Sequence, residues 1–345
     1  MLPLANQKGE EPMKHSKTVS SFALLLSLLA LLFLLSLSVG YAQSSLIDIL
    51  NIPFGKASSA MVFIVTQIRL PRILACMLGG AALAVSGMLL QTLTKNPLAD
   101  SGILGVNTGS GLVITIAIGL IDVSQPAGIR LLPLLAMFGG ISTIFLVYLI
   151  SRKTNHSISP TRLIITGVGL SSMLSGVMVS IISKLDNNKM DYVISWLSGT
   201  VSGDNWETLA LFTPILLVLL LLAYSRSHSL NIMNLNEHTA LALGLHLKKE
   251  RGIILILSTA LASLSVVLVG NITFVGLVAG HITRQFLGSN HRITLPATML
   301  TGMIILLAAD TIGRVLLVGT GIPTGIIVSV IGAPYFLYLM TRLET

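Results

Sequence analysis

The sequence is poor in charge, cysteine and aromatic residues. Only 10% of its 345 residues are Asp, Glu, Lys or Arg, whereas 53% are hydrophobic, and the mean hydropathy is +0.88. A soluble domain typically carries about 25% charged residues, so this chain lacks the polar coat of a water-soluble protein. A β-barrel would alternate polar and apolar residues in stretches of about ten, but the runs here are apolar throughout. The sequence therefore predicts an all-α, polytopic membrane protein.

Other absences narrow the range of functions that this chain could have. The single cysteine, Cys76, cannot form a disulfide within the chain. The basic residues are scattered through short loops, so the net charge of +8 does not indicate a nucleic-acid partner. Gly55-Lys56 lacks the first glycine and the Ser/Thr of a nucleotide-binding loop, and no catalytic triad or carboxylate pair is evident. We expect neither enzyme activity nor a bound cofactor in this chain.

Ionisable residues are also scarce where an ion pathway would need them. The seven histidines lie in, or at the inner edge of, the segments assigned below to the cytoplasm, and none is at mid-membrane beside a carboxylate. A metal site is therefore not expected. A secondary transporter driven by protons or sodium usually needs ionisable groups at mid-membrane. An ion-driven secondary transporter remains one alternative function for this chain, and a purely structural membrane subunit is another.

Apolar runs that can cross about 30 Å of hydrocarbon predict the membrane segments. Eight occur at 19–40, 72–93, 103–121, 131–150, 163–183, 208–224, 294–313 and 323–341. Residues 252–283 contain no Asp, Glu, Lys or Arg, and as one helix they would extend about 48 Å at 1.5 Å per residue. Because Gly270-Asn271 is a plausible break, this region predicts two short helices, at 253–269 and 272–287, and ten in total.

The N-terminal segment has two interpretations. Lys8, Lys14 and Lys17 precede an apolar stretch, as in a signal peptide. The apolar core of a signal peptide is usually about 7–15 residues, which is shorter than the stretch here. We therefore expect an uncleaved first helix, with residues 1–18 as a cytoplasmic tail and 19–342 as one membrane domain.

The basic residues support ten crossings with both termini in the cytoplasm. The inner segments would then hold 14 of the 21 Lys and Arg residues, as the positive-inside rule requires. These are Lys8, Lys14, Lys17, Lys95, Arg152, Lys153, Arg162, Arg226, Lys248, Lys249, Arg251, Arg284, Arg292 and Arg342. The outer segments hold Lys56, Arg69, Arg72, Arg130, Lys184, Lys189 and Arg314.

Three of the outer arginines suggest a docking site. Arg69, Arg72 and Arg314 lie at the edges of apolar segments, on the side where positive charge is unfavourable for topology. An acidic partner that docks from outside would give them a role there. The sequence leaves two alternatives open: Arg69 and Arg72 could anchor lipid headgroups, and Arg314 could pair with Asp310 four residues earlier on its helix.

Connecting segments supply further candidates. Residues 185–207 contain Tyr192, Trp196 and Trp206, which suit an extracytoplasmic interface. The longest cytoplasmic loop, 225–250, contains Glu237, Ala240 and Gly244 in the pattern E-x-x-A-x-x-x-G. That spacing predicts a short helix ending at Gly244, which could enter a cleft of a partner or lie on lipid. Small residues four apart, such as Gly276 and Gly280, indicate close helix packing.

Several short motifs follow one another along the chain. They are Arg69-Leu70-Pro71-Arg72, Gly80 to Gly87, Asn96-Pro97-Leu98-Ala99, Leu104-Gly105-Val106, Gly276-Leu277-Val278, Ala308-Ala309-Asp310, Pro323-Thr324-Gly325 and Gly332-Ala333-Pro334. In this order they resemble the motifs of the FecCD-type permeases, the membrane subunits of ABC importers for iron–siderophore complexes, haem and cobalamin. The resemblance covers about residues 45–342. In one departure, Gly280 precedes His281 where the family usually has proline.

The resemblance implies a type II importer permease of ten helices, with a pathway between two permease subunits that are identical or paralogous. It implies that Arg69, Arg72 and Arg314 meet glutamates of an extracytoplasmic solute-binding protein, and that Glu237, Ala240 and Gly244 contact a cytoplasmic ATPase dimer. The cytoplasmic gate would include Asn96, Pro97, Leu98, Ser159, Pro160 and Thr161. Ferric siderophore is the expected cargo, with cobalamin or haem as alternatives.

Overall fold

The computed structural model describes residues 15–39, 51–52, 54–120, 126–152, 159–201, 205–316 and 322–343. Every regular element in these ranges is helical. The helices of the first part are α1 (His15–Ser38), α3 (Ser59–Phe63), η1 (Ile64–Arg69), α4 (Leu70–Thr94), α5 (Val106–Leu120), α6 (Pro126–Ser151), α7 (Pro160–Ile182) and α8 (Asn187–Leu197). Those of the second part are α9 (Trp206–Ser225), α10 (Ser227–Asn234), α11 (Glu237–Ala242), α12 (Leu247–Val269), α13 (Val275–Leu287), α14 (His291–Leu316) and α15 (Thr324–Leu343).

The predicted helical membrane fold is confirmed. Eight described helices are long and apolar enough to cross a membrane, and each overlaps a predicted segment. Two predicted segments correspond to shorter helices, α5 with 15 residues and α13 with 13. The count of ten crossings therefore stays a prediction. The predicted tail, residues 1–18, lies mostly outside the described residues.

The predicted break at Gly270-Asn271 is confirmed. Helix α12 ends at Val269, Gly270 has a φ of +73°, and α13 begins at Val275. A Cβ at position 270 would lie 2.6 Å from the carbonyl oxygen of Thr200, so only glycine fits this turn without a shift. The Asn271 amide donates a hydrogen bond to the Leu197 carbonyl, at 3.2 Å, and holds the turn against the end of α8.

Helix α4 forms the centre of the bundle, and most of its residues are buried. It packs against α12, α13, α14 and α9. Glycines allow the closest approaches: a Cβ on Gly80 would lie 2.4 Å from the carbonyl oxygen of Gly302 on α14, and one on Gly87 would lie 2.4 Å from the Cα of Gly276 on α13. The predicted packing role is thus found for Gly276, because backbones approach most closely where both helices lack a side chain.

The second membrane helix is longer than predicted. The apolar run predicted from the sequence begins at residue 72, but one continuous helical stretch runs from Ser59 to Thr94. Proline in a helix interior removes a backbone donor and crowds the preceding turn. The π-helical segment η1 comes just before Pro71, and the Leu70 N–H bonds to the Val65 carbonyl five residues back. This wider turn accommodates the proline.

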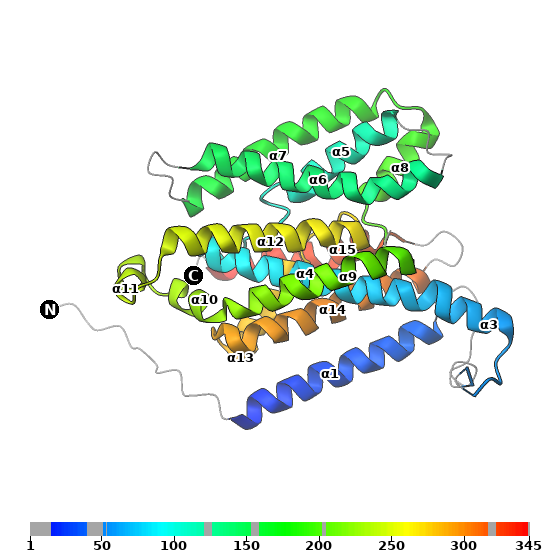
Figure 1. Ribbon diagram of the computed structural model, residues 1–345, viewed down its shortest axis with the longest axis horizontal. Coiled ribbons are helices and arrows are strands. Elements are labelled where there is room, and N and C mark those ends of the chain that lie inside the picture. The colour runs from blue at the N-terminus through cyan, green and yellow to red at the C-terminus, as the bar shows by residue number, and fades with distance from the viewer. Residues whose placement is uncertain are drawn as a thin grey trace.

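Figure 1 shows the helices arranged in layers that share one long axis. Helices α5, α6, α7 and α8 form one group, α4, α9, α12 and α14 form the middle, and α1 lies along the other side. Helix α11 lies at one end of the bundle and α3 near the other. We call these the α11 end and the α3 end. They carry the two sets of predicted contact residues.

Candidate functional sites at the two ends of the bundle

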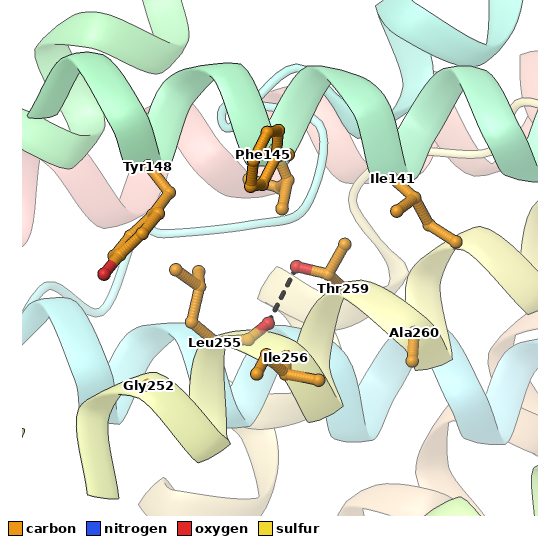
Figure 2. Close-up of a pocket in the computed structure, with 9 residues that line it drawn as sticks. Ile141, Phe145, Tyr148, Gly252, Leu255, Ile256, Thr259 and Ala260 are labelled. Atoms are coloured by element: carbon orange, nitrogen blue, oxygen red, sulfur yellow. Dashed lines mark hydrogen bonds between the residues drawn. The ribbon is translucent and has the colours of Figure 1, made fainter. Parts of the chain in front are cut away.

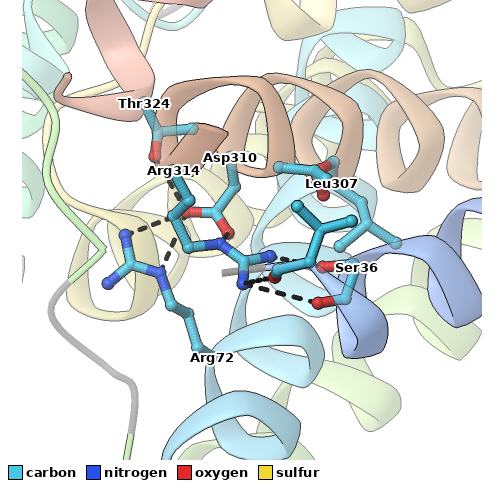
Figure 3. A network of polar contacts seen from close by, with 8 residues as sticks. Ser36, Arg72, Leu307, Asp310, Arg314 and Thr324 are labelled. Carbon is cyan, nitrogen blue, oxygen red and sulfur yellow. Dashed lines mark hydrogen bonds and ion pairs between the residues drawn. The ribbon is translucent and has the colours of Figure 1, made fainter. Parts of the chain in front are cut away.

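Asp310 is the centre of a polar cluster near the α3 end (Figure 3). Its side chain is 0% exposed. One carboxylate oxygen accepts hydrogen bonds from Arg72 Nε at 3.0 Å, from Arg72 Nη2 at 2.9 Å and from Thr324 Oγ1 at 3.1 Å. The other accepts from Arg314 Nε at 3.0 Å. This carboxylate therefore connects α4, α14 and α15, and two charged donors offset the burial of its charge.

The same cluster attaches α1 to the bundle. Arg314 donates to the backbone carbonyls of Ser36, at 3.4 Å, and Val39, at 3.2 Å, and to the Ser36 hydroxyl (Figure 3). Arg69 donates to the carbonyl of Leu37. Carbonyls of the last helical turn have no partner within the helix, and a cation is favourable at this negative end of the helix dipole. The two arginines thus cap the C-terminus of α1.

The three arginines predicted to dock a partner therefore lie in one region, but they differ in exposure. The Arg72 side chain is 27% exposed and that of Arg314 is 11% exposed. Arg69 as a residue is 4% exposed. The alternative role for Arg314, an ion pair with Asp310, is present in the structure. Sequence reasoning missed the Arg72–Asp310 pair, since the two residues are 238 positions apart.

At the α11 end, the predicted short helix is present and ends as expected. Asn236 caps α11 by accepting a hydrogen bond from the Thr239 N–H at 2.7 Å. The Leu245 N–H bonds to the Ala240 carbonyl at 3.1 Å, and Gly244 has a φ of +82°. This is the glycine C-cap that the pattern predicted. No heavy atom of the described residues lies within 4 Å of where a Gly244 Cβ would be, so the end of the helix faces open space.

The residues of the predicted coupling pattern attach α11 to the body of the protein. The side chain of Ala240 is fully buried, and Glu237 forms an ion pair with Arg251 on α12. The hydrogen bond from Arg251 holds the pKa of Glu237 below its ordinary value, and the positive charges of Arg251, Lys95 and His238 also lower it. The exposed residues of this segment include two large apolar ones, Leu241 and Leu243, which are 56% and 58% exposed. Sequence reasoning did not single out these two leucines.

The predicted gate residues follow α4 and begin α7. Lys95 has a left-handed conformation with φ 51°, and the Asn96 side chain accepts a hydrogen bond from the Leu98 N–H at 2.9 Å, which forms a tight turn. Leu98 packs with an apolar cluster on α13 and α15 that includes Leu277 and Leu339. Ser159 has an extended backbone and precedes Pro160, the first residue of α7, and Thr161 is exposed.

A contact connects this turn to the loop that carries α11. The Lys95 ammonium donates to the carbonyl of Leu235 at 2.7 Å. Leu235 follows α10 and comes just before α11. A displacement of the α10–α11 segment would therefore act directly on the residue that precedes Asn96.

Comparisons with known proteins agree with this architecture. The family model described as the FecCD transport family matches residues 28–342. The chain is 33% identical to the iron(3+)-hydroxamate import system permease protein FhuG of Bacillus subtilis, over 95% of this chain and 98% of that one. It is 35% identical to the Fe(3+)-citrate import system permease protein YfmE of the same organism, over 95% and 96%.

A relative for another iron compound and a solved structure are also similar. The chain is 33% identical to the hemin transport system permease protein HmuU of Yersinia pestis, over 92% of this chain and 94% of that one. A metal-chelate type ABC transporter, solved in an inward-facing conformation, matches with a TM-score of 0.79 and 31% identity over 94% of this chain and 99% of that one. The chain is a multi-pass membrane protein that belongs to the FecCD transport family.

Proposed function

We propose that this chain is the membrane permease subunit of an ABC importer that moves a ferric siderophore across the cytoplasmic membrane. The observation that carries the proposal is the match of nearly the whole chain to permeases of iron-chelate import systems. Such a permease needs a solute-binding protein outside, an ATPase inside and a second permease subunit. A separate surface of the chain is proposed for each.

The α3 end is proposed to receive the solute-binding protein. Arg72 is the most exposed of the three arginines predicted to dock a partner, and part of its side chain stays accessible while it bonds to Asp310. It would meet a carboxylate of the binding protein directly. Arg314 and Arg69 are more deeply buried and hold α1 in place. Their proposed role in docking is to hold Arg72 and the end of α1 in position. After a small rearrangement, Arg314 and Arg69 would also contact the binding protein themselves.

The α11 end is proposed to contact the ATPase. A short helix with two exposed leucines can enter an apolar groove of a partner. Leu241 and Leu243 would provide the contact, and Glu237, Ala240 and Gly244 would fix the orientation of the helix. Through the bond between Lys95 and the Leu235 carbonyl, movement of α11 would reach the turn at Asn96, Pro97 and Leu98.

Helix α7 is proposed to face the pathway and the second permease subunit. Only Leu163 and Gly167 of this helix are buried, and a Cβ added at Gly169 or Gly176 would meet no heavy atom of the described residues within 4 Å. A helix with small residues on an open face allows a second helix or a bulky ligand to approach closely. Pro160 and Thr161 begin this helix and Ser159 precedes it, which supports their assignment to the gate.

Transport by the reconstituted complex tests the proposal. Proteoliposomes would contain this permease, its second subunit and the ATPase, with the solute-binding protein outside and ATP inside. We expect uptake of radioactive iron bound to a siderophore, and no uptake without the ATPase. Uptake driven by a proton or sodium gradient alone would instead support a secondary transporter.

Haem is the second cargo to test, because a hemin permease is among the similar proteins. Competition between ferric siderophore and hemin for the same proteoliposomes separates the two. Hemin uptake that excess ferric siderophore does not reduce would overturn the siderophore assignment while leaving the importer mechanism intact. Cobalamin can be tested in the same way.

A further inference from the structure

An apolar groove runs along the outside of the bundle between α6 and α12 (Figure 2). Its volume is about 400 Å³, which is within the range of about 300–1,000 Å³ for small-molecule sites. The groove is lined by Ile141, Ile144, Phe145, Tyr148, Gly252, Leu255, Ile256, Thr259 and Ala260. The one hydroxyl on its α12 side, that of Thr259, donates to the Leu255 carbonyl at 2.7 Å. The walls therefore offer an almost purely apolar surface.

The groove is open along its length. Phe145 and Ile256 are 58% and 69% exposed and form its rim. Gly252 widens one end, since a Cβ added there would meet no heavy atom of the described residues within 4 Å. In a membrane-spanning bundle such an opening faces hydrocarbon or another chain. Its size and apolar walls suit an acyl chain.

Basic residues gather at one end of the groove. On α6, the lining residues Ile141, Phe145 and Tyr148 share one face, and the Arg152 N–H bonds to the Tyr148 carbonyl at 3.1 Å, which carries that face on to Arg152. On α12, Lys248 and Lys249 lie four and three residues before Gly252. By this spacing they continue the lining face beyond Gly252, and Figure 2 shows Gly252 and Tyr148 at the same end of the groove.

All three of these basic side chains are available to a ligand. Arg152, Lys248 and Lys249 are exposed, and none of them forms an ion pair with the described part of the chain. Two neighbouring carboxylates are already used by other residues: Glu250 pairs with Arg226 at 3.4 Å, and Glu237 pairs with Arg251. The end of the groove therefore carries three positive charges above an apolar channel.

We propose that this groove is a binding site for an anionic phospholipid. One acyl chain lies between α6 and α12, and the phosphate and anionic headgroup meet Arg152, Lys248 and Lys249. Two features of the site match two features of that ligand: apolar length and negative charge at one end. Its assignment to the cytoplasmic leaflet rests on the proposed topology, but binding itself does not depend on transport.

Native mass spectrometry of the full-length protein tests the charge contacts. The protein in detergent is offered phosphatidylglycerol or phosphatidylcholine with identical chains. We expect the wild type to retain phosphatidylglycerol, and the triple variant Arg152→Gln, Lys248→Gln, Lys249→Gln to retain it about tenfold less. Arg292→Gln is the matched control, because Arg292 is an exposed arginine at the start of α14, away from the groove. Equal losses in both variants, or equal retention of both lipids, would overturn the proposal.

An added tryptophan tests where the acyl chain lies. Ile256→Trp places a fluorophore at the rim of the groove, and Val218→Trp places one on α9, where Val218 is 55% exposed. After subtraction of the wild-type signal, brominated phosphatidylglycerol should quench position 256 several-fold more than brominated phosphatidylcholine does. The two lipids should quench position 218 equally. No quenching at 256 by either lipid would mean that a protein surface covers the groove, and equal quenching would mean ordinary lipid contact; either result overturns the proposal. Neither result would bear on iron transport.

Discussion

The two ends of the bundle both use a carboxylate–arginine pair, but they bury it to different degrees. Asp310 at the α3 end is 0% exposed and bonds to two arginines and a threonine from three helices. The Glu237 side chain at the α11 end is 54% exposed and bonds to Arg251. The first pair lies within the packing of the helices, and the second connects a surface helix to the bundle.

This difference indicates what each end can do. Removing one partner of a buried pair leaves an uncompensated charge and costs about 3–5 kcal/mol, whereas an exposed pair contributes about 0–1 kcal/mol. The α3 end is therefore a rigid platform on which a partner can dock. The α11 helix is attached weakly enough to move when a partner pushes or pulls it. In the proposed importer, this difference would suit a docking site at the α3 end and a coupling element at the α11 end.

The largest expected effect concerns whether the two ends face opposite compartments. In a protein with the buried Cys76 replaced by Ser, a cysteine at Lys56 should react with a membrane-impermeant maleimide added outside whole cells. One at Leu243, which is 58% exposed, should react only after the membrane is opened. The reason is the asymmetry of basic residues, which predicts that the α11 end lies in the cytoplasm. Labelling of Leu243→Cys from outside would reverse the assignment of the two ends.

Asp310→Ala should destabilise the protein strongly. The change leaves Arg72 and Arg314 without their shared carboxylate, and we expect a loss of about 3–5 kcal/mol in the free energy of unfolding. A fluorescence-detected thermal unfolding curve in detergent measures it, and Asp191→Ala on the exposed face of α8 is the control. If both variants melt like the wild type, the cluster does not hold α4, α14 and α15 together.

Docking of the solute-binding protein should respond most to Arg72. Arg72→Glu replaces an attraction with repulsion and should weaken binding by about 2–5 kcal/mol, the range for disrupted interfacial charge pairs. Arg72→Lys keeps the charge and should retain most of the affinity. Surface plasmon resonance with the permease in nanodiscs gives the dissociation constant, and a thermal unfolding curve checks that each variant is folded.

A charge-reversed glutamate on the binding protein should restore part of the affinity lost in Arg72→Glu. The same substitution at Arg314 and Arg69 should also impair docking, but mainly through displacement of α1, so that charge reversal of the partner rescues them less. If Arg72→Glu and Arg314→Glu both bind as tightly as the wild type at low salt, the arginines serve only the internal cluster.

Substitutions in the α11 segment should change the coupling between the permease and the ATPase without lowering the stability of the folded protein. Leu241→Ser with Leu243→Ser removes the two exposed apolar contacts and should weaken ATPase binding by roughly 1–2 kcal/mol. Glu237→Lys and Gly244→Pro should reorient the helix and lower ligand-stimulated ATP hydrolysis while docking of the binding protein persists. Leu222→Ser, at a residue on α9 that is 44% exposed and lies outside the α10–α11 segment, is the control. Full transport with unchanged ATP hydrolysis in the double leucine variant, in Glu237→Lys and in Gly244→Pro would exclude α11 as the coupling element.

Much of the fold could be predicted from the sequence because membrane helices are long apolar runs. The break at Gly270 was visible because a charge-free segment of 32 residues is too long for one crossing and glycine marks a turn. The continuation of the second membrane helix back to Ser59 could not be predicted, because the π-helical segment joins α3 to α4 just before Pro71, where a boundary is normally expected. Apolar pattern alone cannot distinguish lipid-facing from core-facing residues, so the central position of α4 could not be predicted.

The sites were predictable only where the contact is local in sequence. Asp310 and Arg314 are four residues apart, and Gly244 ends a pattern of eight residues, so a single sequence reveals both. The contacts of Asp310 with Arg72 and of Arg69 with Leu37 join remote helices and leave no trace in spacing. The exposure of Leu241 and Leu243 depends on which face of α11 packs on α12, which the pattern does not specify.

The smallest expected effect is the pH dependence of the attachment of α11. The hydrogen bond from Arg251 holds the pKa of Glu237 below its ordinary value of about 4.5. A carboxylate whose pKa is lowered by folding stabilises the folded arrangement above that ordinary value, and the contribution is lost as the pH falls through the lowered pKa. The ion pair should therefore persist throughout the neutral range and weaken only at acidic pH. Because the Glu237 side chain is 54% exposed, solvent screens the pair and the change should be small.

A nitroxide attached at Leu243→Cys measures this effect as the mobility of α11. Mobility should be constant from about pH 8 to about pH 5 and should increase below the ordinary pKa of the carboxyl group. In a Glu237→Gln background the spectrum should be more mobile at every pH and show no step. A step near neutral pH would instead show that a group other than Glu237 controls the attachment of α11. The attachment of the coupling helix would then depend on physiological pH, and the contrast between a permanent platform at one end and a simple surface pair at the other would no longer hold.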